Sequence, residues 1–233
     1  MRSPTAIPPA VEASPRSGSP SVCALAGGAL GPFGPGVTVV QHAGALGEGL
    51  RRGLATGADW IWVLDGSAAP RPGALDELLG ALERTGGLPD PVLLGGVVVD
   101  AGGRVDEARA AWYRRAPTEL AMAAAERRLL PIRASAGPVL VSRRGAEAEP
   151  PRERAAFGAG AVLEWTARLL RDGVGYLVPA SEYVAAGAAR DPALDPLTAA
   201  RLVGGRAFSG TDRLRVGFEL AERARRRARS PAS

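Results

Sequence analysis

The sequence predicts a single α/β domain built around a mostly parallel sheet, and two patterns carry that prediction. Short apolar and β-branched runs alternate with stretches of helical periodicity, as in a parallel sheet whose strands are joined by helices. The run Trp60–Leu64 (WIWVL) is apolar at every position, so both faces of such a strand must be covered. With 233 residues, 46% of them hydrophobic, the chain can bury a substantial core, which excludes a wholly disordered protein.

The first half of the chain is predicted to hold three strands and two helices. Leu46, Leu50 and Leu54 recur every four residues, which places them on one face of a helix that Gly57 ends. Four leucines further along fit the i, i+3, i+4, i+7 pattern of a second amphipathic helix, ended by a Gly-Gly pair. The predicted elements are a weak apolar segment at 22–30, strands at 37–40, 60–64 and 92–99, a return strand from Arg104, and helices over 46–54 and 75–82.

The second half continues the alternation of helices and strands. An alanine-rich helix is predicted at 118–130, because Pro117 precedes it and Pro131 follows it. The other elements are strands at 139–142 and 174–178, a charged loop at 143–155, a helix at 162–171 and an Arg-rich helix at 212–229. We therefore divide the chain into a disordered leader (1–20), the α/β domain (21–210) and an Arg-rich C-terminal helix and tail (211–233).

Positive charge is concentrated at the C-terminal end of the chain. The 29 basic residues, all arginines, outnumber the 24 acids and give a net charge of +5. Five of these arginines fall in the last eleven residues, which hold no acid, at positions 223, 225, 226, 227 and 229. The rest of the chain is balanced, so no nucleic-acid partner is predicted. The tail has two interpretations, a peripheral contact with an anionic membrane or a solvated helix end, and the second is favoured.

A single cysteine, Cys23, and a single histidine, His42, limit the available chemistry. They exclude an intrachain disulfide, a thiolate metal cluster and any site that needs two histidines. No apolar run reaches about 18 residues, so no transmembrane helix is predicted. His42 follows a predicted strand and can contact a phosphate or a base there, but a solvated loop histidine is the favoured interpretation.

Asp65 is the strongest local candidate for chemistry. It follows the run Trp60–Leu64, and ligands of open α/β sheets bind beyond the carboxyl ends of the strands. A carboxylate there can bind a divalent cation, which in turn neutralises a diphosphate. The alternative, favoured about two to one, is that Asp65 only caps its own turn, because Asp-Gly is a common turn pair.

Several stretches resemble family 2 glycosyltransferases, in the order found there. GLATGADWIWVLDGSAAPRPGALDELLGAL (53–82) resembles the aromatic-rich strand that runs into a short acidic DxD or DDD motif, a proline and a leucine-rich helix. LEWTARLLRDGVGYLVPAS (163–181) resembles the EWT-R-L-G helix and closing strand of the family. With VTVVQHAGALGEGLRRGL, VLLGGVVVDAGGRV and GPVLVSRRG, the resemblance covers roughly 37–182, and it is strongest to actinobacterial rhamnosyl- and galactofuranosyl-transferase-like members.

This resemblance implies a GT-A fold and transfer of a sugar from a nucleotide-diphosphate donor to an acceptor hydroxyl. It implies that Asp65, assisted by Ser67, binds Mg²⁺ or Mn²⁺ and the diphosphate, and that an acid serves as general base. Glu164 is the best remaining acid for that role, but it can also be the family's structural acid, and a solvent-facing helix residue is the favoured alternative. Trp165 and Arg168 can line an acceptor pocket, with a core position as the favoured interpretation of Trp165. The implied acceptor is a cell-envelope, polysaccharide or lipid-linked glycan, handled in the cytoplasm or at the inner face of the membrane.

The sequence also departs from the family at three places. Gly66 and Ser67 stand where further acids are expected, and 158–162 lacks the acids that precede the EWT-R helix. Only the segment 22–30 and a Gly/Pro link precede the strand at 37–40, so the nucleotide-clasping lobe is shortened. These losses leave two hypotheses: a glycosyltransferase with weakened activity, or an inactive pseudo-glycosyltransferase that acts as a binding or scaffold partner.

Overall fold

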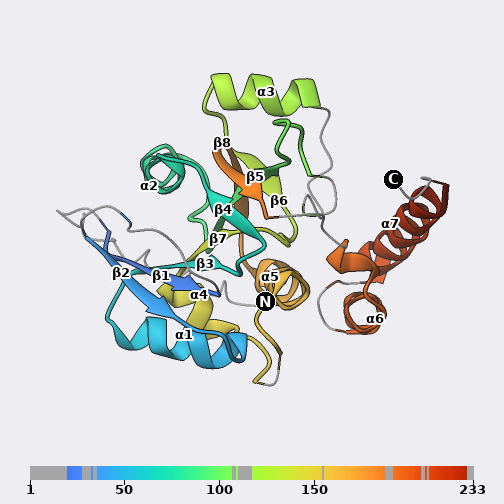
Figure 1. Ribbon diagram of the computed structural model, residues 1–233, viewed down its shortest axis with the longest axis horizontal. Helices are drawn as coiled ribbons and strands as arrows, with labels where there is room; N and C mark the ends of the chain where they lie inside the picture. Colours follow the sequence, from blue (N-terminus) through green and yellow to red (C-terminus); the bar gives the residue numbers. More distant parts are fainter. Residues whose placement is uncertain are drawn as a thin grey trace, which may run out of the picture.

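An eight-stranded sheet forms the centre of the molecule in the computed structural model (Figure 1). The structure describes residues 20–27, 33, 36–106, 109, 117–153, 155–186, 191–205, 208 and 210–229. The disordered leader predicted at 1–20 therefore lies outside the described residues, Pro20 excepted. The sheet order is β2-β1-β3-β7-β5-β8-β4, and β6 pairs with β8 beside this path.

The strands confirm the prediction of a mostly parallel sheet. Five of the eight, β2, β1, β3, β5 and β8, run in one direction, and β7, β4 and β6 run against them. The strands are β1 (Val22–Ala26), β2 (Val37–Gln41), β3 (Trp60–Leu64), β4 (Ala68–Pro70), β5 (Leu93–Val99), β6 (Leu130–Ile132), β7 (Val139–Ser142) and β8 (Gly175–Ala185).

Helices cover both faces of this sheet, as the apolar strand β3 requires. Ile61 and Val63 point to one face, where they share a core with α1, α3 and α5. Trp62 and Leu64 point to the other face, where they pack with α2. The helices are α1 (Leu46–Ala55), α2 (Ala74–Glu83), α3 (Pro117–Ala125), α4 (Arg143–Ala148), α5 (Ala159–Asp172), the short 3₁₀ helix η1 (Pro192–Leu194), α6 (Pro196–Gly204) and α7 (Gly210–Arg229).

The segment 22–30 turns out to contain a central strand. Every residue of β1 is buried, and β1 pairs in parallel with β2 on one side and β3 on the other. Only the link 27–36 joins β1 to β2, and Phe33 within it packs edge-on against Trp62 with ring centroids 5.1 Å apart. A weak apolar pattern was enough for a strand here because both neighbouring strands supply hydrogen bonds.

Three predicted boundaries are wrong. The strand expected at 174–178 is β8, which continues to Ala185. The loop expected at 143–155 begins with α4, whose start is capped by the Ser142 hydroxyl accepting from the Gly145 N–H at 3.1 Å. The helix expected at 118–130 ends at Ala125, because Arg127 takes a left-handed conformation with φ of 51°. The end of that segment instead forms the short strand β6, which pairs with β8.

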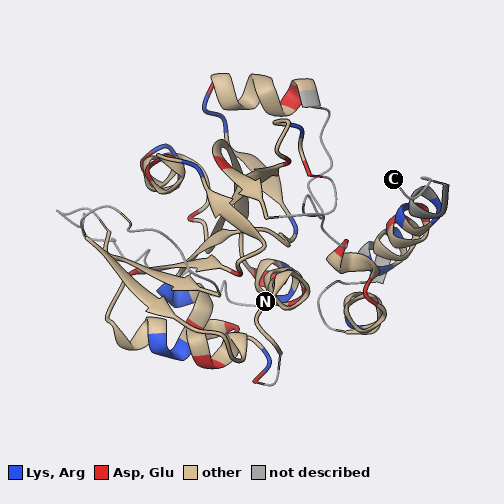
Figure 2. Ribbon diagram, in the orientation of Figure 1, with Lys and Arg blue, Asp and Glu red and all other residues tan. Residues whose placement is uncertain are grey.

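The C-terminal helices pack against the outer side of α5 (Figure 1). Leu163 and Ala167 of α5 share a buried cluster with Leu202 of α6 and with Val216 and Leu220 of α7. Basic and acidic positions are interspersed over the body and along the described part of α7 (Figure 2). None of the described helices combines the length and the apolar character needed to cross a membrane.

Candidate functional site

The carboxyl ends of the parallel strands β1, β2 and β3 meet at one edge of the sheet. The residues that follow these strands are Gly27, His42 and Asp65. The three ends are joined directly, because the Gly27 N–H donates to the Leu64 carbonyl at 2.7 Å and the His42 N–H donates to the Ala26 carbonyl at 2.9 Å. This is the edge at which open α/β sheets bind their ligands.

The carboxylate of Asp65 is held by the turn that follows it. Its Oδ1 accepts from the Ser67 N–H at 3.0 Å and from the Ser67 hydroxyl at 2.7 Å. Gly66 between them has φ of 81°, a left-handed conformation that favours glycine over the acid expected there. Asp65 thus caps its own turn with one oxygen only. Its Oδ2 is buried and has no hydrogen-bond partner among the described residues.

Gly27 and the start of α5 close around Asp65. A Cβ added at Gly27 would lie 2.9 Å from the Asp65 carbonyl oxygen and 3.2 Å from the Phe157 ring. Phe157 comes immediately before α5, so the first turn of α5 is brought near the same strand ends. Glycine is required at position 27 because no side chain fits in this close approach.

Arg109 is a charged neighbour of Asp65 that the sequence did not single out. It lies in the segment after β5, its side chain is 4% exposed, and it forms an ion pair with Asp106. Burial raises the pKa of Asp65 above its ordinary value, and the Ser67 hydrogen bonds and the Arg109 charge lower it less than burial raises it. No local pattern marks Arg109, because its charge acts on Asp65 from a distant part of the chain.

The described residues do not fit a divalent cation at this edge. Among them, no group of three or more His, Cys, Asp or Glu residues is arranged to hold a metal ion. Mg²⁺ and Mn²⁺ prefer several oxygen ligands, whereas Asp65 offers one free carboxylate oxygen and Arg109 places a positive charge beside it. The described residues by themselves therefore supply no such ligand group for Mg²⁺ or Mn²⁺ around Asp65.

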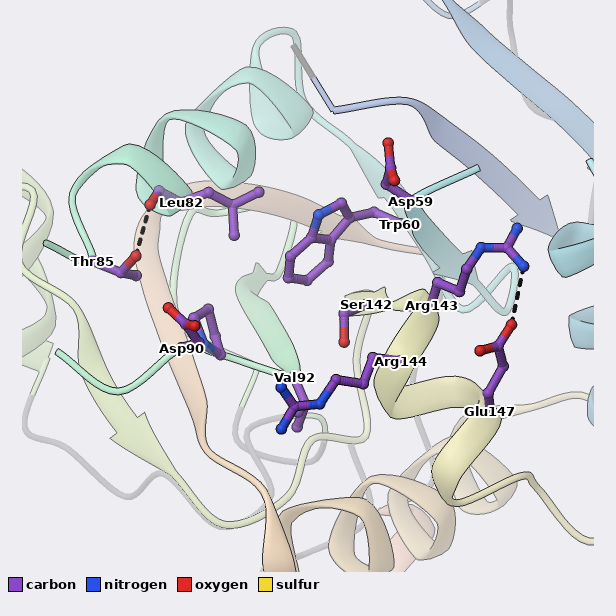
Figure 3. A pocket seen from close by; sticks show the side chains of 11 residues that line it. Asp59, Trp60, Leu82, Thr85, Asp90, Val92, Ser142, Arg143, Arg144 and Glu147 are labelled. Carbon is purple, nitrogen blue, oxygen red and sulfur yellow. Dashed lines mark hydrogen bonds and ion pairs between the residues drawn. The ribbon is translucent and has the colours of Figure 1, made fainter. Parts of the chain in front are cut away.

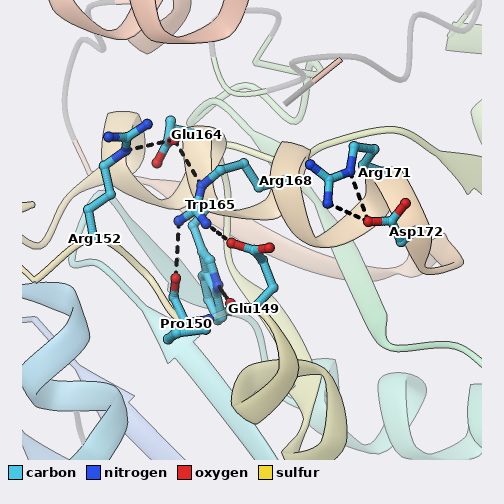
Figure 4. Close-up of polar contacts among 8 residues, drawn as sticks. All are labelled: Glu149, Pro150, Arg152, Glu164, Trp165, Arg168, Arg171 and Asp172. Atoms are coloured by element: carbon cyan, nitrogen blue, oxygen red, sulfur yellow. Dashed lines mark hydrogen bonds and ion pairs between the residues drawn. The ribbon is translucent and has the colours of Figure 1, made fainter. Parts of the chain in front are cut away.

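Glu164 lies inside a network of ion pairs on α5 (Figure 4). Its side chain is 4% exposed, and its Oε1 accepts from Arg152 Nε at 3.1 Å and from Arg168 Nε at 2.9 Å. Arg168 also pairs with Glu149, and it donates to the Pro150 carbonyl at 3.1 Å. The solvent-facing alternative for Glu164 is wrong. The carboxylate is instead buried and joins α5 to the segment after α4.

Trp165 and Arg168, the two residues expected to line an acceptor pocket, are both anchored within the protein. Trp165 is fully buried, and its indole N–H donates to the Glu149 carbonyl at 2.6 Å. The Arg168 side chain is 11% exposed and is held by its two ion pairs. Neither residue is brought beside Asp65 by any contact in the described structure.

Other polar residues near the ends of the strands occupy separate places. The Asp59 carboxylate, at the start of β3, accepts from the Ser21 hydroxyl at 2.9 Å, at the end of the strand opposite to Asp65. Asp100, after β5, caps its own turn by accepting from the N–H groups of Gly102 and Arg104. His42 is 8% exposed and its Nε2 donates to the Ala45 carbonyl at 2.8 Å, so the expected solvated loop histidine is wrong.

A cavity of about 490 Å³ opens at the amino edge of the sheet, away from Asp65 (Figure 3). Trp60 forms one wall, with Ser142 and Arg143 at the start of α4 beside it. The Arg143 guanidinium is fully engaged, with the carbonyls of Leu54 and Ala58 and with Glu147. None of the residues at the carboxyl edge described above lines this cavity.

Comparison with known proteins finds likeness among solved structures. No family model matches the chain, and no curated protein matches it. The chain is similar to a crystal structure of GalNAc-T7 with UDP, GalNAc and Mn²⁺, at 14% sequence identity and a TM-score of 0.43. The likeness covers 64% of this chain and 32% of that one, so this chain spans about a third of the length of the protein it matches. At this level the two share part of a chain path, and no residue role passes from one to the other.

Proposed function

We propose that this chain is a glycosyltransferase-like protein that binds a nucleotide-diphosphate sugar at the Asp65 edge and transfers the sugar to an acceptor hydroxyl. The observation that carries the proposal is the Asp65 carboxylate at the carboxyl end of β3, with Oδ1 fixed by Ser67 and Oδ2 unpartnered. A buried oxygen without a partner is costly to keep, and a hydroxyl of a bound sugar or acceptor would satisfy it.

Asp65 is suited to accept a proton in such a reaction. Burial raises the pKa of Asp65 toward neutral pH, and a general base works best when its pKa lies near the operating pH. Ser67 holds the carboxylate in one orientation, and Arg109 supplies positive charge at the edge where a diphosphate would carry negative charge. Glu164 is assigned a positioning role, since its Oε1 already accepts from two guanidinium groups.

The acceptor that we propose is a cell-envelope, polysaccharide or lipid-linked glycan, reached from the cytoplasmic side of a membrane. A peripheral contact through the arginines beyond Arg223 fits this setting, and Arg225 among them is exposed. Trp165 and Arg168 are engaged inside the protein, so an acceptor would have to meet other residues.

The second candidate is a pseudo-glycosyltransferase that binds a partner without catalysis. It is favoured by the separate places of three acids that could have assisted Asp65: Glu164, Asp59 and Asp100 are each held elsewhere by their own partners. A chain that keeps its apolar strands but only Asp65 of the expected acidic motif would retain the fold and lose sugar transfer.

Titration calorimetry with UDP-, GDP- and dTDP-sugars tests the proposal. We expect at least one donor to bind the wild-type chain with the same affinity in Mn²⁺ and in EDTA. Asp65→Ala should weaken that binding by about tenfold or more, the scale of one lost charge-assisted hydrogen bond. Glu83→Ala removes an exposed acid on α2 and should leave binding unchanged.

The outcomes separate the two candidates. Donor hydrolysis or sugar transfer by the wild type, lost in Asp65→Ala, supports the enzyme. Donor binding without turnover supports the pseudo-glycosyltransferase. Absence of binding for every donor, with or without Mn²⁺, would overturn the sugar-nucleotide proposal.

A further inference from the structure

A second hollow of about 480 Å³ lies against the outer side of α5 and is lined mainly by arginines. It is bounded by the segment after α4, by the C-terminal half of α5 and by the junction of α6 with α7. Four of its eight lining residues are arginines, and the other four are Glu149, Pro150, Gly204 and Gly205. The four arginines are Arg152, Arg168, Arg171 and Arg213.

Acidic side chains offset only part of this positive charge. Glu164 pairs with Arg152 and Arg168, Glu149 pairs with Arg168, and Asp172 pairs with Arg171 (Figure 4). Among the described residues, these three carboxylates pair with Arg152, Arg168 and Arg171. Arg213 has no acidic partner among the described residues, and its Nε donates to the Phe208 carbonyl at 2.8 Å.

Two arginines at the hollow keep unused hydrogen-bond donors. Arg152 uses only its Nε, toward Glu164, and Arg213 uses only its Nε, so the terminal N–H groups of both have no partner among the described residues. Both side chains are exposed at the rim of the hollow and can reach a ligand in it. A guanidinium presents its donors as a fork that matches two oxygens of a phosphoryl group.

The guanidinium groups also act on one another. Burial lowers the pKa of Arg168, and the charge of Arg171 lowers it further. Like charges held this close repel, and an anion between them would relieve the repulsion. Gly204 and Gly205 line the opposite wall without side chains, which leaves room for such an anion.

We propose that this hollow, the arginine pocket, binds a phosphorylated small molecule, with Arg152, Arg171 and Arg213 contacting the phosphoryl oxygens. A phosphomonoester carries about −1.5 to −2 charges at neutral pH, a closer match to several guanidinium groups than the single charge of a carboxylate. The volume exceeds that of a phosphate alone and falls in the range of small-molecule sites. No residue of the Asp65 edge lines this pocket, so the site is additional to the proposed donor site.

Calorimetry at low ionic strength with inorganic phosphate, pyrophosphate and acetate as probes tests the arginine pocket. We expect phosphate and pyrophosphate to bind the wild-type chain and acetate to bind at least about tenfold more weakly. The double variant Arg171→Ala/Arg213→Ala should weaken phosphate binding by about tenfold or more. It should also lose the increase in melting temperature that phosphate gives the wild type.

A matched double variant controls for net charge. Arg52→Ala/Arg215→Ala also removes one arginine paired with an exposed acid and one exposed arginine of α7, neither lining the pocket, and it should bind phosphate as the wild type does.

Asp65→Ala should bind phosphate normally even if it loses the sugar nucleotide, which separates this proposal from the first. Equal loss in both double variants, undiminished binding in Arg171→Ala/Arg213→Ala, or equal binding of acetate and phosphate would each overturn the proposal. If the Arg171→Ala/Arg213→Ala chain fails to fold, Arg213→Gln alone should show the same weakening, and unchanged phosphate binding there would equally overturn it.

Discussion

The surroundings of Asp65 disfavour its charged form. Its Oδ2 has no hydrogen-bond partner among the described residues, and burial is the largest influence on its pKa. Arrangements of this kind are common at functional sites, where a group is kept ready for a ligand at some cost in stability. The alternative, a purely structural turn cap, accounts for Oδ1 but leaves Oδ2 without a role.

Replacing Asp65 by asparagine should therefore stabilise the chain at neutral pH. Because the folded-state pKa is raised above the ordinary value of 3.8, folding favours the protonated acid. The favourable contribution of Asp65 is complete below the unfolded pKa and is lost as the pH rises through the folded pKa. Asp65→Asn should melt above the wild type at pH 7, and the difference should shrink as the pH falls toward 4. Glu83→Gln serves as the exposed control, and a lower melting temperature for Asp65→Asn at pH 7 would contradict the assigned cause.

Glu164 has a different character, since its charge is compensated on two sides. Glu164→Gln removes the buried carboxylate that Arg152 and Arg168 share, so we expect a loss of about 3 kcal/mol in the free energy of unfolding. Glu147→Gln, which breaks an exposed pair with Arg143, should cost less than about 1 kcal/mol. Urea denaturation measures the free energy of unfolding of both variants. Equal losses in Glu164→Gln and Glu147→Gln would show that the buried network contributes no more than a surface pair.

Strand β1 depends on a close approach at its end. A methyl group added at Gly27 would press on the Asp65 carbonyl 2.9 Å away, so Gly27→Ala should lower the free energy of unfolding by about 1–3 kcal/mol. It should also weaken donor binding, because the strand end and Asp65 must separate. Gly86→Ala meets no atom within 4 Å and should change stability by less than about 1 kcal/mol. An unchanged free energy of unfolding in Gly27→Ala would contradict a tight contact between Gly27 and the Asp65 carbonyl.

Elements with a strong local pattern could be predicted, and those fixed by distant contacts could not. The burial of β3 on both faces follows from its unbroken apolar run, and α1 follows from leucines spaced four residues apart. Helix α4 was missed because Arg143 is held there by the carbonyls of Leu54 and Ala58, far away in the sequence. Strand β6 was missed for a similar reason, since its pairing partner β8 lies more than forty residues further along the chain.

The C-terminal helix belongs to the body of the molecule for much of its length. The expectation of a solvated arginine tail is wrong for Arg223, which is 8% exposed and pairs with Asp191 at 3.1 Å and with Glu219 at 3.4 Å. Asp191 also caps the 3₁₀ helix η1 before α6. Arg223 thus ties α7 to the segment that leads into α6.

Arg223→Ala should loosen this attachment. Removing this buried cation takes one charged partner from Asp191 and one from Glu219, so we expect a loss of about 3 kcal/mol in the free energy of unfolding. Arg225→Ala, two residues along the same helix and exposed, should change it by less than about 0.5 kcal/mol. Denaturation curves followed by circular dichroism compare the two variants. A loss as small as that of Arg225→Ala would mean that apolar contacts alone hold α7 in place.

The sequence by itself determined the α/β class, most of the strands and helices, and the position of Asp65 at the end of an apolar strand. These follow from hydrophobic periodicity and turn residues, which act over a few neighbouring positions. Only the tertiary structure decided that Arg109 lies beside Asp65, that Glu164 is enclosed by arginines, and that four arginines meet around one hollow. Such contacts join residues far apart in the chain, and their energies depend on burial and charge that exist only once the elements have packed together.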